Sequence, residues 1–132
     1  MALSPTLGAG GAGMTIFGIA HVQLGITPGG EDRARGFYSG LLGLRELAKP
    51  ETLRDRGGAW FQCGMQEIHC GVEETVAPSR RHPALLVEEL DALRARLDAA
   101  GVPTETDREL PGYRRFYATD PFGNRIEFLE RA

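Results

Sequence analysis

The sequence runs through the same order of predicted elements twice, and this internal repeat restricts the fold more than any other feature. Each copy is predicted to contain a strand, an amphipathic helix, a short strand and a hairpin. The first copy spans residues 15–76 and the second spans 82–131, with a linker at 77–81. Because a 132-residue chain is too short for two independent cores, we expect 15–132 to form a single domain.

Alternation of apolar residues in the first copy predicts a strand over 16–26, with His21 and Gln23 on the face opposite Val22 and Leu24. The remaining elements follow from apolar residues at helical spacing and from strand-forming runs. They are a helix over 31–42, a strand near 44–48 and a hairpin of 59–63 with 67–72.

The second copy ends in the hairpin with the strongest turn signal. Asp120-Pro121 and Gly123-Asn124 suit a tight turn, because Pro fixes its own φ while Gly and Asn tolerate positive φ. In the strand after this turn, Glu127 faces away from its apolar neighbours. A carboxylate in a central strand needs a partner, since an unpaired buried charge is costly. Before this hairpin we expect a strand over 82–87, a helix over 90–100 and an extended piece at 104–106.

Superposing the two copies aligns the residues that can bind a metal. His21 matches His82 in the first strand of each copy, and His69 matches Glu127 in the last strand. The interval between the members of each set is similar, 48 residues from His21 to His69 and 45 from His82 to Glu127. If the copies pair about a pseudo-twofold axis, three imidazoles and one carboxylate converge, a donor set that suits one divalent ion such as Zn²⁺, Ni²⁺, Mn²⁺ or Fe²⁺.

Structural interpretations of the same residues stay open. His21 can be a core histidine bonded to a carbonyl, and His82 can simply begin a strand. Glu127 can pair with Arg115 or Arg125, and Glu67 shares a face with His69 and can replace it as the fourth ligand.

Composition excludes several function classes. A net charge of −3 without a Lys/Arg run argues against nucleic-acid and membrane partners. The two cysteines are not spaced as a metal-binding pair, and with no secretory signal we expect a reduced, cytoplasmic protein. Residues 1–14 are small and Gly-rich, which predicts a flexible leader.

The sequence resembles the vicinal oxygen chelate superfamily, the glyoxalase, bleomycin-resistance and ring-cleaving dioxygenase group. The resemblance lies in Ile19–Leu24, in Phe37–Leu44 and in Asp120–Glu127. It implies an α+β fold in which two βαβββ modules form a cupped, mainly antiparallel sheet with helices on the outside. It also implies metal ligands at His21, His82 and Glu127. His69 falls on a fourth, more variable position, where glyoxalase-like members often carry glutamate.

The resemblance further implies a metal-dependent lyase, isomerase or dioxygenase that acts on a small oxygenated substrate. In that family the metal holds two adjacent substrate oxygens as a Lewis acid. We assign Glu67 as the candidate general base beside the ligand Glu127. Four further residues are expected to line the substrate cleft: Gln23, Trp60, Arg115 and Tyr117.

Other members of the family suggest alternative functions. One is a metal-free protein that sequesters a small molecule, as bleomycin-resistance members do, although such a pocket has no need for the retained ligand set. Another is antibiotic modification by thiol transfer, as in fosfomycin-resistance members, against which the lack of an evident cationic pocket argues. Exposed edge strands favour a homodimer, with the site either within one chain or shared between two.

Overall fold

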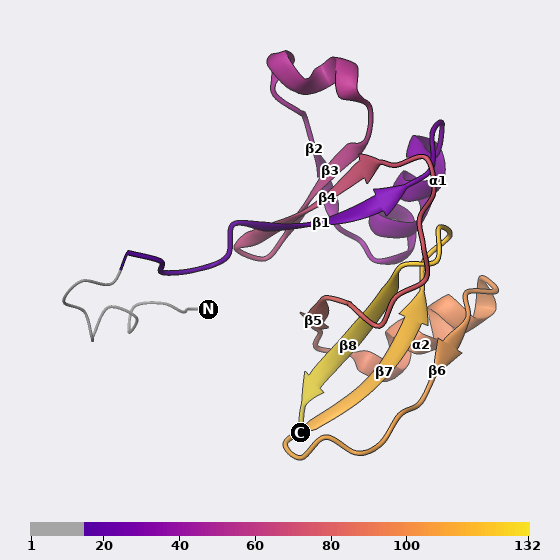
Figure 1. The fold of residues 1–132 in the computed structure, drawn as a ribbon. Coiled ribbons are helices and arrows are strands. Elements are labelled where there is room, and N and C mark those ends of the chain that lie inside the picture. Colours follow the sequence, from indigo (N-terminus) through magenta and orange to yellow (C-terminus); the bar gives the residue numbers. More distant parts are fainter. Residues whose placement is uncertain (1–14) are drawn as a thin grey trace.

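The computed structural model describes residues 15–132, so the predicted leader at 1–14 lies outside the described residues. The chain forms two four-stranded sheets, one from each half of the sequence (Figure 1). The strand order is β1-β4-β3-β2 in the first sheet and β5-β8-β7-β6 in the second. In each sheet the first strand pairs parallel with the last, and the other pairs are antiparallel. This arrangement confirms the predicted α+β fold of two βαβββ modules.

The two modules share the same order of strands and main helix, as the repeat predicts, and module one has an additional 3₁₀ helix. Module one contains β1 (His21–Ile26), α1 (Glu31–Ala34), the π-helical η2 (Arg35–Leu41), β2 (Arg45–Leu47), the 3₁₀-helical η3 (Glu51–Arg56), β3 (Ala59–Cys63) and β4 (Gln66–Val72). Module two contains β5 (Ala84–Leu86), α2 (Leu90–Ala99), β6 (Thr104–Glu105), β7 (Tyr113–Thr119) and β8 (Arg125–Arg131).

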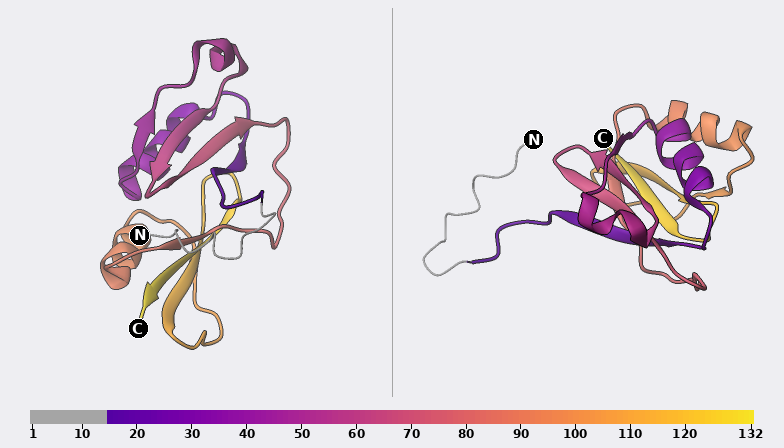
Figure 2. Two further views of the ribbon diagram at one scale, coloured as in Figure 1. Left: turned by 90° about the vertical axis from the view of Figure 1, so that its left-hand side faces the viewer. Right: turned by 90° about the horizontal axis from the view of Figure 1, so that it is seen from above.

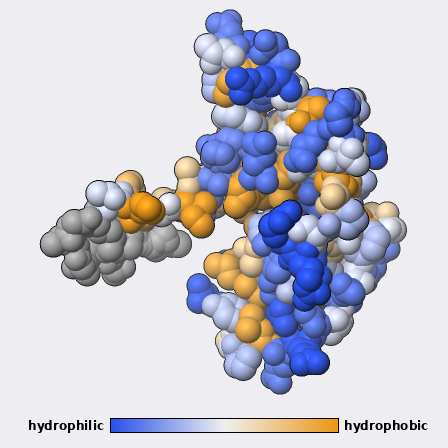
Figure 3. All heavy atoms as spheres, viewed as in Figure 1, coloured by the Kyte–Doolittle hydropathy of each residue, from blue (hydrophilic) through white to orange (hydrophobic). Residues whose placement is uncertain are grey.

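The first strand of each copy is predicted to begin too early, and one predicted helix has a different type. In module two, β5 begins at Ala84 instead of residue 82, so His82 lies just before the strand. The first strand begins at His21 instead of residue 16, because only Ala20 of the preceding segment bonds to β4, through Glu67 N at 3.1 Å. The side chains of Ile16, Phe17 and Ile19 are consequently exposed. Figure 3 shows hydrophobic residues on the surface of the segment that extends away from module one. The predicted helix over 31–42 is present, but most of it is π-helical.

The strand register confirms the alignment of the two copies. Gln23 pairs with His69 in module one, and Ala84 pairs with Glu127 in module two. His21 and His82 each lie two residues before those positions, so they are equivalent, as are His69 and Glu127. Across the neighbouring strand, Trp60 pairs with His69 and Tyr117 pairs with Glu127. The repeat therefore places chemically different side chains at matching points of two similar sheets.

A single hydrophobic core joins the modules. Helices α1, η2 and α2 lie toward the same side of the molecule (Figure 2), and their buried residues belong to one cluster with Phe61, Phe116 and Phe128. The packing of Phe122 from module two against Gly30 of module one is so close that a Cβ on Gly30 would lie 2.6 Å from the ring. This contact leaves room only for glycine.

Asp120 provides the polar part of the same joint. Its buried carboxylate accepts hydrogen bonds from the backbone N–H groups of Phe122 and Asn124, at 2.9 and 2.8 Å. It also accepts a 2.6 Å bond from the hydroxyl of Tyr38 in module one, and Asn124 Nδ2 donates to the carbonyl of Gly25 at 2.7 Å. The turn predicted from Asp120-Pro121-Phe122-Gly123-Asn124 thus also fixes how the two modules meet.

Candidate functional site

Module one carries a stack of three rings on the open face of its sheet. The rings of Trp60 and His69 are stacked, with centroids 3.7 Å apart and an angle of 5° between their planes. On its other side His69 stacks on His21 at 3.9 Å and 14°. His69 is buried between them, while His21 remains exposed. The three side chains come from β3, β4 and β1, so neighbouring strands hold the stack in place.

Glu67 completes this cluster. Its Oε1 lies 2.8 Å from His69 Nε2, and its side chain is about one-third exposed. A carboxylate only accepts hydrogen bonds, so the imidazole N–H donates. Because ring nitrogens bond in the plane of the ring, two stacked imidazoles direct their donor atoms along roughly parallel planes instead of toward one point. His21 and His69 therefore do not converge within module one, and His69 Nε2 is already engaged by Glu67.

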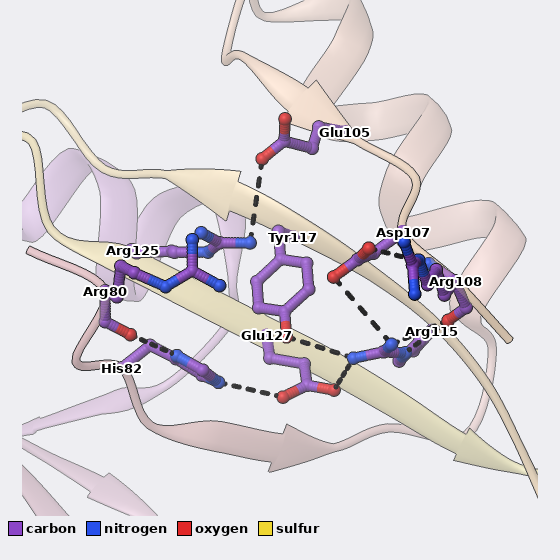
Figure 4. Close-up of polar contacts among 9 residues, drawn as sticks. All are labelled: Arg80, His82, Glu105, Asp107, Arg108, Arg115, Tyr117, Arg125 and Glu127. Carbon is purple, nitrogen blue, oxygen red and sulfur yellow. Dashed lines mark hydrogen bonds and ion pairs between the residues drawn. The ribbon is translucent and has the colours of Figure 1, made fainter. Parts of the chain in front are cut away.

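Module two holds an imidazole and a carboxylate in direct contact. His82 Nε2 lies 3.0 Å from Glu127 Oε1, and His82 Nδ1 lies 2.8 Å from the backbone carbonyl of Arg80 (Figure 4). Both of these oxygens are hydrogen-bond acceptors. A neutral imidazole has one N–H and can serve only one of them. In the tautomer that donates Nδ1–H to Arg80, the lone pair of Nε2 faces Glu127 Oε1, an arrangement in which both atoms could bind one metal ion.

Arg115 binds the other oxygen of Glu127. Its Nη1 donates to Glu127 Oε2 and to the hydroxyl of Tyr117, both at 3.0 Å. Its Nε and Nη2 donate to the carbonyl of Arg108 at 3.2 and 2.6 Å. The hydrogen bond to Glu127 is the main cause of a raised pKa of Arg115. The guanidinium is thus occupied on all sides by protein oxygens, and it fixes the orientation of the carboxylate that faces His82.

These contacts divide the predicted site residues into two half-sites. The module-one half-site contains His21, His69, Glu67 and Trp60, and the module-two half-site contains His82, Glu127, Arg115 and Tyr117. Within residues 15–132, no group of three or more His, Cys, Asp or Glu side chains is arranged to hold a metal ion. The remaining predicted residue, Gln23, lines a groove of about 410 Å³ that also reaches His82. A single chain thus does not bring the four predicted ligands together.

Two relevant groups do not figure among the predicted site residues. The carbonyl of Arg80, which binds His82, gives no signal in a sequence because every residue has one. Arg125 could have been predicted from the sequence, because it lies two residues before Glu127 and strand alternation places both side chains on the same face. It lies against the face of the Tyr117 ring, with its guanidinium carbon 3.9 Å from the centroid.

Comparison with known proteins agrees with this architecture. Residues 18–128 match the sequence profile of the Glyoxalase/Bleomycin resistance protein/Dioxygenase superfamily. The chain belongs to this superfamily. The resemblance noted in the sequence is thereby confirmed, and the two βαβββ modules are those of a glyoxalase-like fold.

Several solved structures of the superfamily are similar to the chain. A glyoxalase family protein from Bacillus anthracis is 47% identical, with a TM-score of 0.84 over 90% of this chain and 98% of that one. The fosfomycin resistance protein FosX from Listeria monocytogenes, solved with Mn(II) and sulfate, is 18% identical, with a TM-score of 0.73 over 89% of this chain and 93% of that one.

A lactoylglutathione lyase from Agrobacterium tumefaciens is 23% identical, with a TM-score of 0.62 over 83% of this chain and 91% of its own. FosX and the lyase share the fold at low identity, so they do not establish an activity. No curated protein matches the chain. No helix within residues 15–132 is both long enough and apolar enough to cross a membrane.

Proposed function

We propose that the protein is a metal-dependent enzyme of the vicinal oxygen chelate type, a lyase, isomerase or dioxygenase acting on a small oxygenated molecule. The observation that carries this proposal is the bonding of His82. Its Nδ1 binds a backbone carbonyl and its Nε2 faces a carboxylate. Histidines that bind metals generally donate their second N–H to such a carbonyl, which fixes the tautomer that presents the other nitrogen to the ion. The donor set therefore fits a divalent metal at His82 and Glu127.

A third ligand is supplied by His21 of a second copy of the chain. His21 is exposed and occupies the strand position equivalent to His82, yet within one chain it belongs to the other half-site. In a homodimer with twofold symmetry, the module-one half-site of each copy would face the module-two half-site of the other, producing two identical sites. Zn²⁺, Ni²⁺, Mn²⁺ and Fe²⁺ all accept two imidazoles and a carboxylate with positions left for substrate.

When bound, such an ion supplies Lewis acidity to adjacent substrate oxygens. The protein's own residues supply the rest. Glu67 is partly exposed and moves the proton. Its hydrogen-bond partner, His69, is held in place by stacking on Trp60. Arg115 and Tyr117 keep Glu127 oriented. Gln23 lines the groove that leads to His82 and contacts the substrate there.

Elemental analysis of the full-length protein tests the proposal. We expect about one metal ion per chain, removed by chelation and restored by anaerobic addition of one of the four ions. His21→Ala, His82→Ala and Glu127→Ala should each abolish the uptake. Glu130→Gln is the matched control, because Glu130 lies on the same strand but faces the other way and binds Arg114 at 3.2 Å.

If the wild-type protein takes up none of the ions, the enzyme proposal is wrong. A metal-free protein that sequesters a small molecule would then be the better description. If the metal binds but Glu67→Gln retains full turnover on a substrate found by screening hydroxy-ketones, hemithioacetals and catechols, Glu67 is not the base.

A further inference from the structure

A cavity of about 480 Å³ lies at one end of the open face of the second sheet. Strands β6, β7 and β8 line it through Glu105, Tyr117 and Arg125, and the linker adds Ser79. Ser79 also lines the groove that reaches His82, so the two spaces lie next to each other. The cavity is therefore close to the module-two half-site.

Among the described residues that line this cavity, Arg125 is the only arginine, and its guanidinium has few hydrogen-bond partners. Its Nε is buried and has no hydrogen-bond partner among residues 15–132. Its nearest ionic contact is Glu105, at 3.7 Å from Nη2, and the Glu105 side chain is two-thirds exposed. That separation is too long for a hydrogen bond. A buried donor without a partner is costly, so its presence in a fold calls for an explanation.

The ring of Tyr117 holds Arg125 without using its hydrogen-bond donors. The guanidinium lies over the face of the ring, 3.9 Å from its centroid. A guanidinium stacked in this way keeps its N–H groups in its own plane, where they match the two oxygens of a carboxylate or a phosphonate. Arg115 differs in this respect, since protein oxygens already occupy its donors.

The residue at the equivalent position in module one, Glu67, has a hydrogen-bond partner on its own strand, whereas Arg125 does not. Arg125 lies two residues before Glu127 and pairs with Thr119 on the neighbouring strand. In the same way, Glu67 lies two residues before His69 and pairs with Gln62. Glu67 binds its neighbour His69 at 2.8 Å, whereas no hydrogen bond joins Arg125 to Glu127. Residues two apart on one face of a strand are separated by about 7 Å. Arg125 is therefore within the length of a small molecule from the proposed metal ligand.

We propose that Arg125 anchors an oxyanion group of the substrate, a carboxylate or a phosphonate, while the oxygenated carbon end lies at His82 and Glu127. The link to catalysis rests on the proposed function, but the anion site is a property of this chain's own residues. The substrate class thus narrows to small oxygenated acids. Figure 4 shows the arrangement, with Arg125 and Glu127 on different sides of the Tyr117 side chain.

Nuclear magnetic resonance of the Arg125 Nε–H group tests this inference in the full-length protein. The signal is identified by its absence from Arg125→Lys and is followed during titration with acetate and, separately, with methylphosphonate. Both titrations are run on zinc-free and zinc-loaded protein. Arg114→Gln is the matched control, since it removes the same charge from the opposite face of the sheet, where Arg114 pairs with Asp91 at 2.6 Å.

We expect a saturable shift of the Arg125 signal with at least one of the two anions, in the wild-type protein and in Arg114→Gln alike. Arg125→Lys should weaken binding of the anion about tenfold, because lysine lacks the planar fork. Glu105→Gln should strengthen it about threefold by removing a competing exposed carboxylate. Comparing acetate with methylphosphonate shows which oxyanion the site prefers.

A shift that rises linearly without saturation, or equal affinity in Arg125→Lys, would overturn the inference. Folding of each variant is checked by its amide spectrum, so that lost binding is not confused with unfolding. Saturable anion binding by a protein that takes up none of the four ions would leave the anion site intact and refute the metal proposal. Zinc uptake without anion binding would refute the anion site and leave the metal proposal intact.

Discussion

At equivalent positions of the two modules, His69 lies stacked between two aromatic rings, whereas Glu127 lies between a histidine and an arginine. The difference comes from the neighbouring strand. Arg115 on β7 aligns with Gly58 before β3, where a Cβ would come within 2.2 Å of the carbonyl oxygen of Cys70. Module one therefore cannot place any side chain at the position from which Arg115 holds Glu127.

The comparison teaches that one repeated backbone supports two different half-sites. Module one offers aromatic faces and a partly exposed carboxylate, which suits contact with substrate and proton movement. Module two offers the buried carboxylate of Glu127, held in a fixed orientation by Arg115 and next to His82, which suits a metal ion. The duplicated sheet supplies the positions, and a few substitutions divide the chemistry between them.

The largest expected effect is the loss of the Glu127 carboxylate. Glu127→Ala leaves Arg115 and His82 partly buried without their common partner, and should destabilise the protein by about 3 kcal/mol. Glu67→Ala removes a pair in which the carboxylate is about one-third exposed, and should cost less than about 1 kcal/mol. Urea unfolding at neutral pH measures both. Equal costs for the two variants would contradict the distinction between the half-sites.

A smaller effect is expected at the joint between the modules. Burial, then the charge of Asp120, raises the pKa of Tyr38 well above its ordinary value of 10.0. Tyr38→Phe loses the buried bond to Asp120 and should cost about 1–2 kcal/mol at neutral pH. Because the folded state holds this proton more tightly, the stability that the hydroxyl provides declines as pH rises above 10.

The cost of Tyr38→Phe should therefore shrink in strongly alkaline solution. Burial likewise raises the pKa of Cys70 from 9.0 to about 12, so the stability of both proteins should begin to fall above pH 9. Urea unfolding at pH 7 and at pH 10.5 separates the two contributions, with Tyr113→Phe as the control. A cost of Tyr38→Phe that does not change with pH would show that the hydroxyl is not responsible.

The smallest expected signal comes from Trp60, the single tryptophan of the chain. Because Trp60, His69 and His21 form one stack, an ion bound by His21 should alter the fluorescence of Trp60. We expect a saturable change on addition of Zn²⁺, absent from Glu127→Gln although Glu127 belongs to the other half-site. A response that persists in Glu127→Gln would indicate that module one binds the ion by itself.

Much of this organisation could be predicted from the sequence. The repeat predicted two equivalent sheets, and alternation along the strands placed His21, His69 and Glu127 on the faces where they are found, whereas His82 lies just before β5 instead of within it. Strand periodicity is local, so a single sequence suffices to reveal it. The Asp120 turn was predicted for the same reason.

The remaining features depend on contacts between distant residues. Periodicity could not show that His69 would stack between Trp60 and His21, or that the backbone of Arg80 would bind His82. It placed the start of the first strand too early, because Ile16 and Ile19 continue the strand-forming composition although no neighbouring strand pairs with them. It also predicted that four ligands converge, without indicating that one chain supplies them in two halves.

Mixing two defective variants tests the shared metal site most directly. His21→Ala keeps an intact module-two half-site, and Glu127→Ala keeps an intact module-one half-site. The two proteins are combined, subunits are exchanged by mild denaturation and refolding, and bound metal is measured. If each site is shared between copies, random exchange restores about a quarter of the wild-type metal content, since half of the dimers are mixed and each mixed dimer has one complete site. Metal content that stays at the level of the separate variants, although mixed dimers have formed, would contradict a shared site.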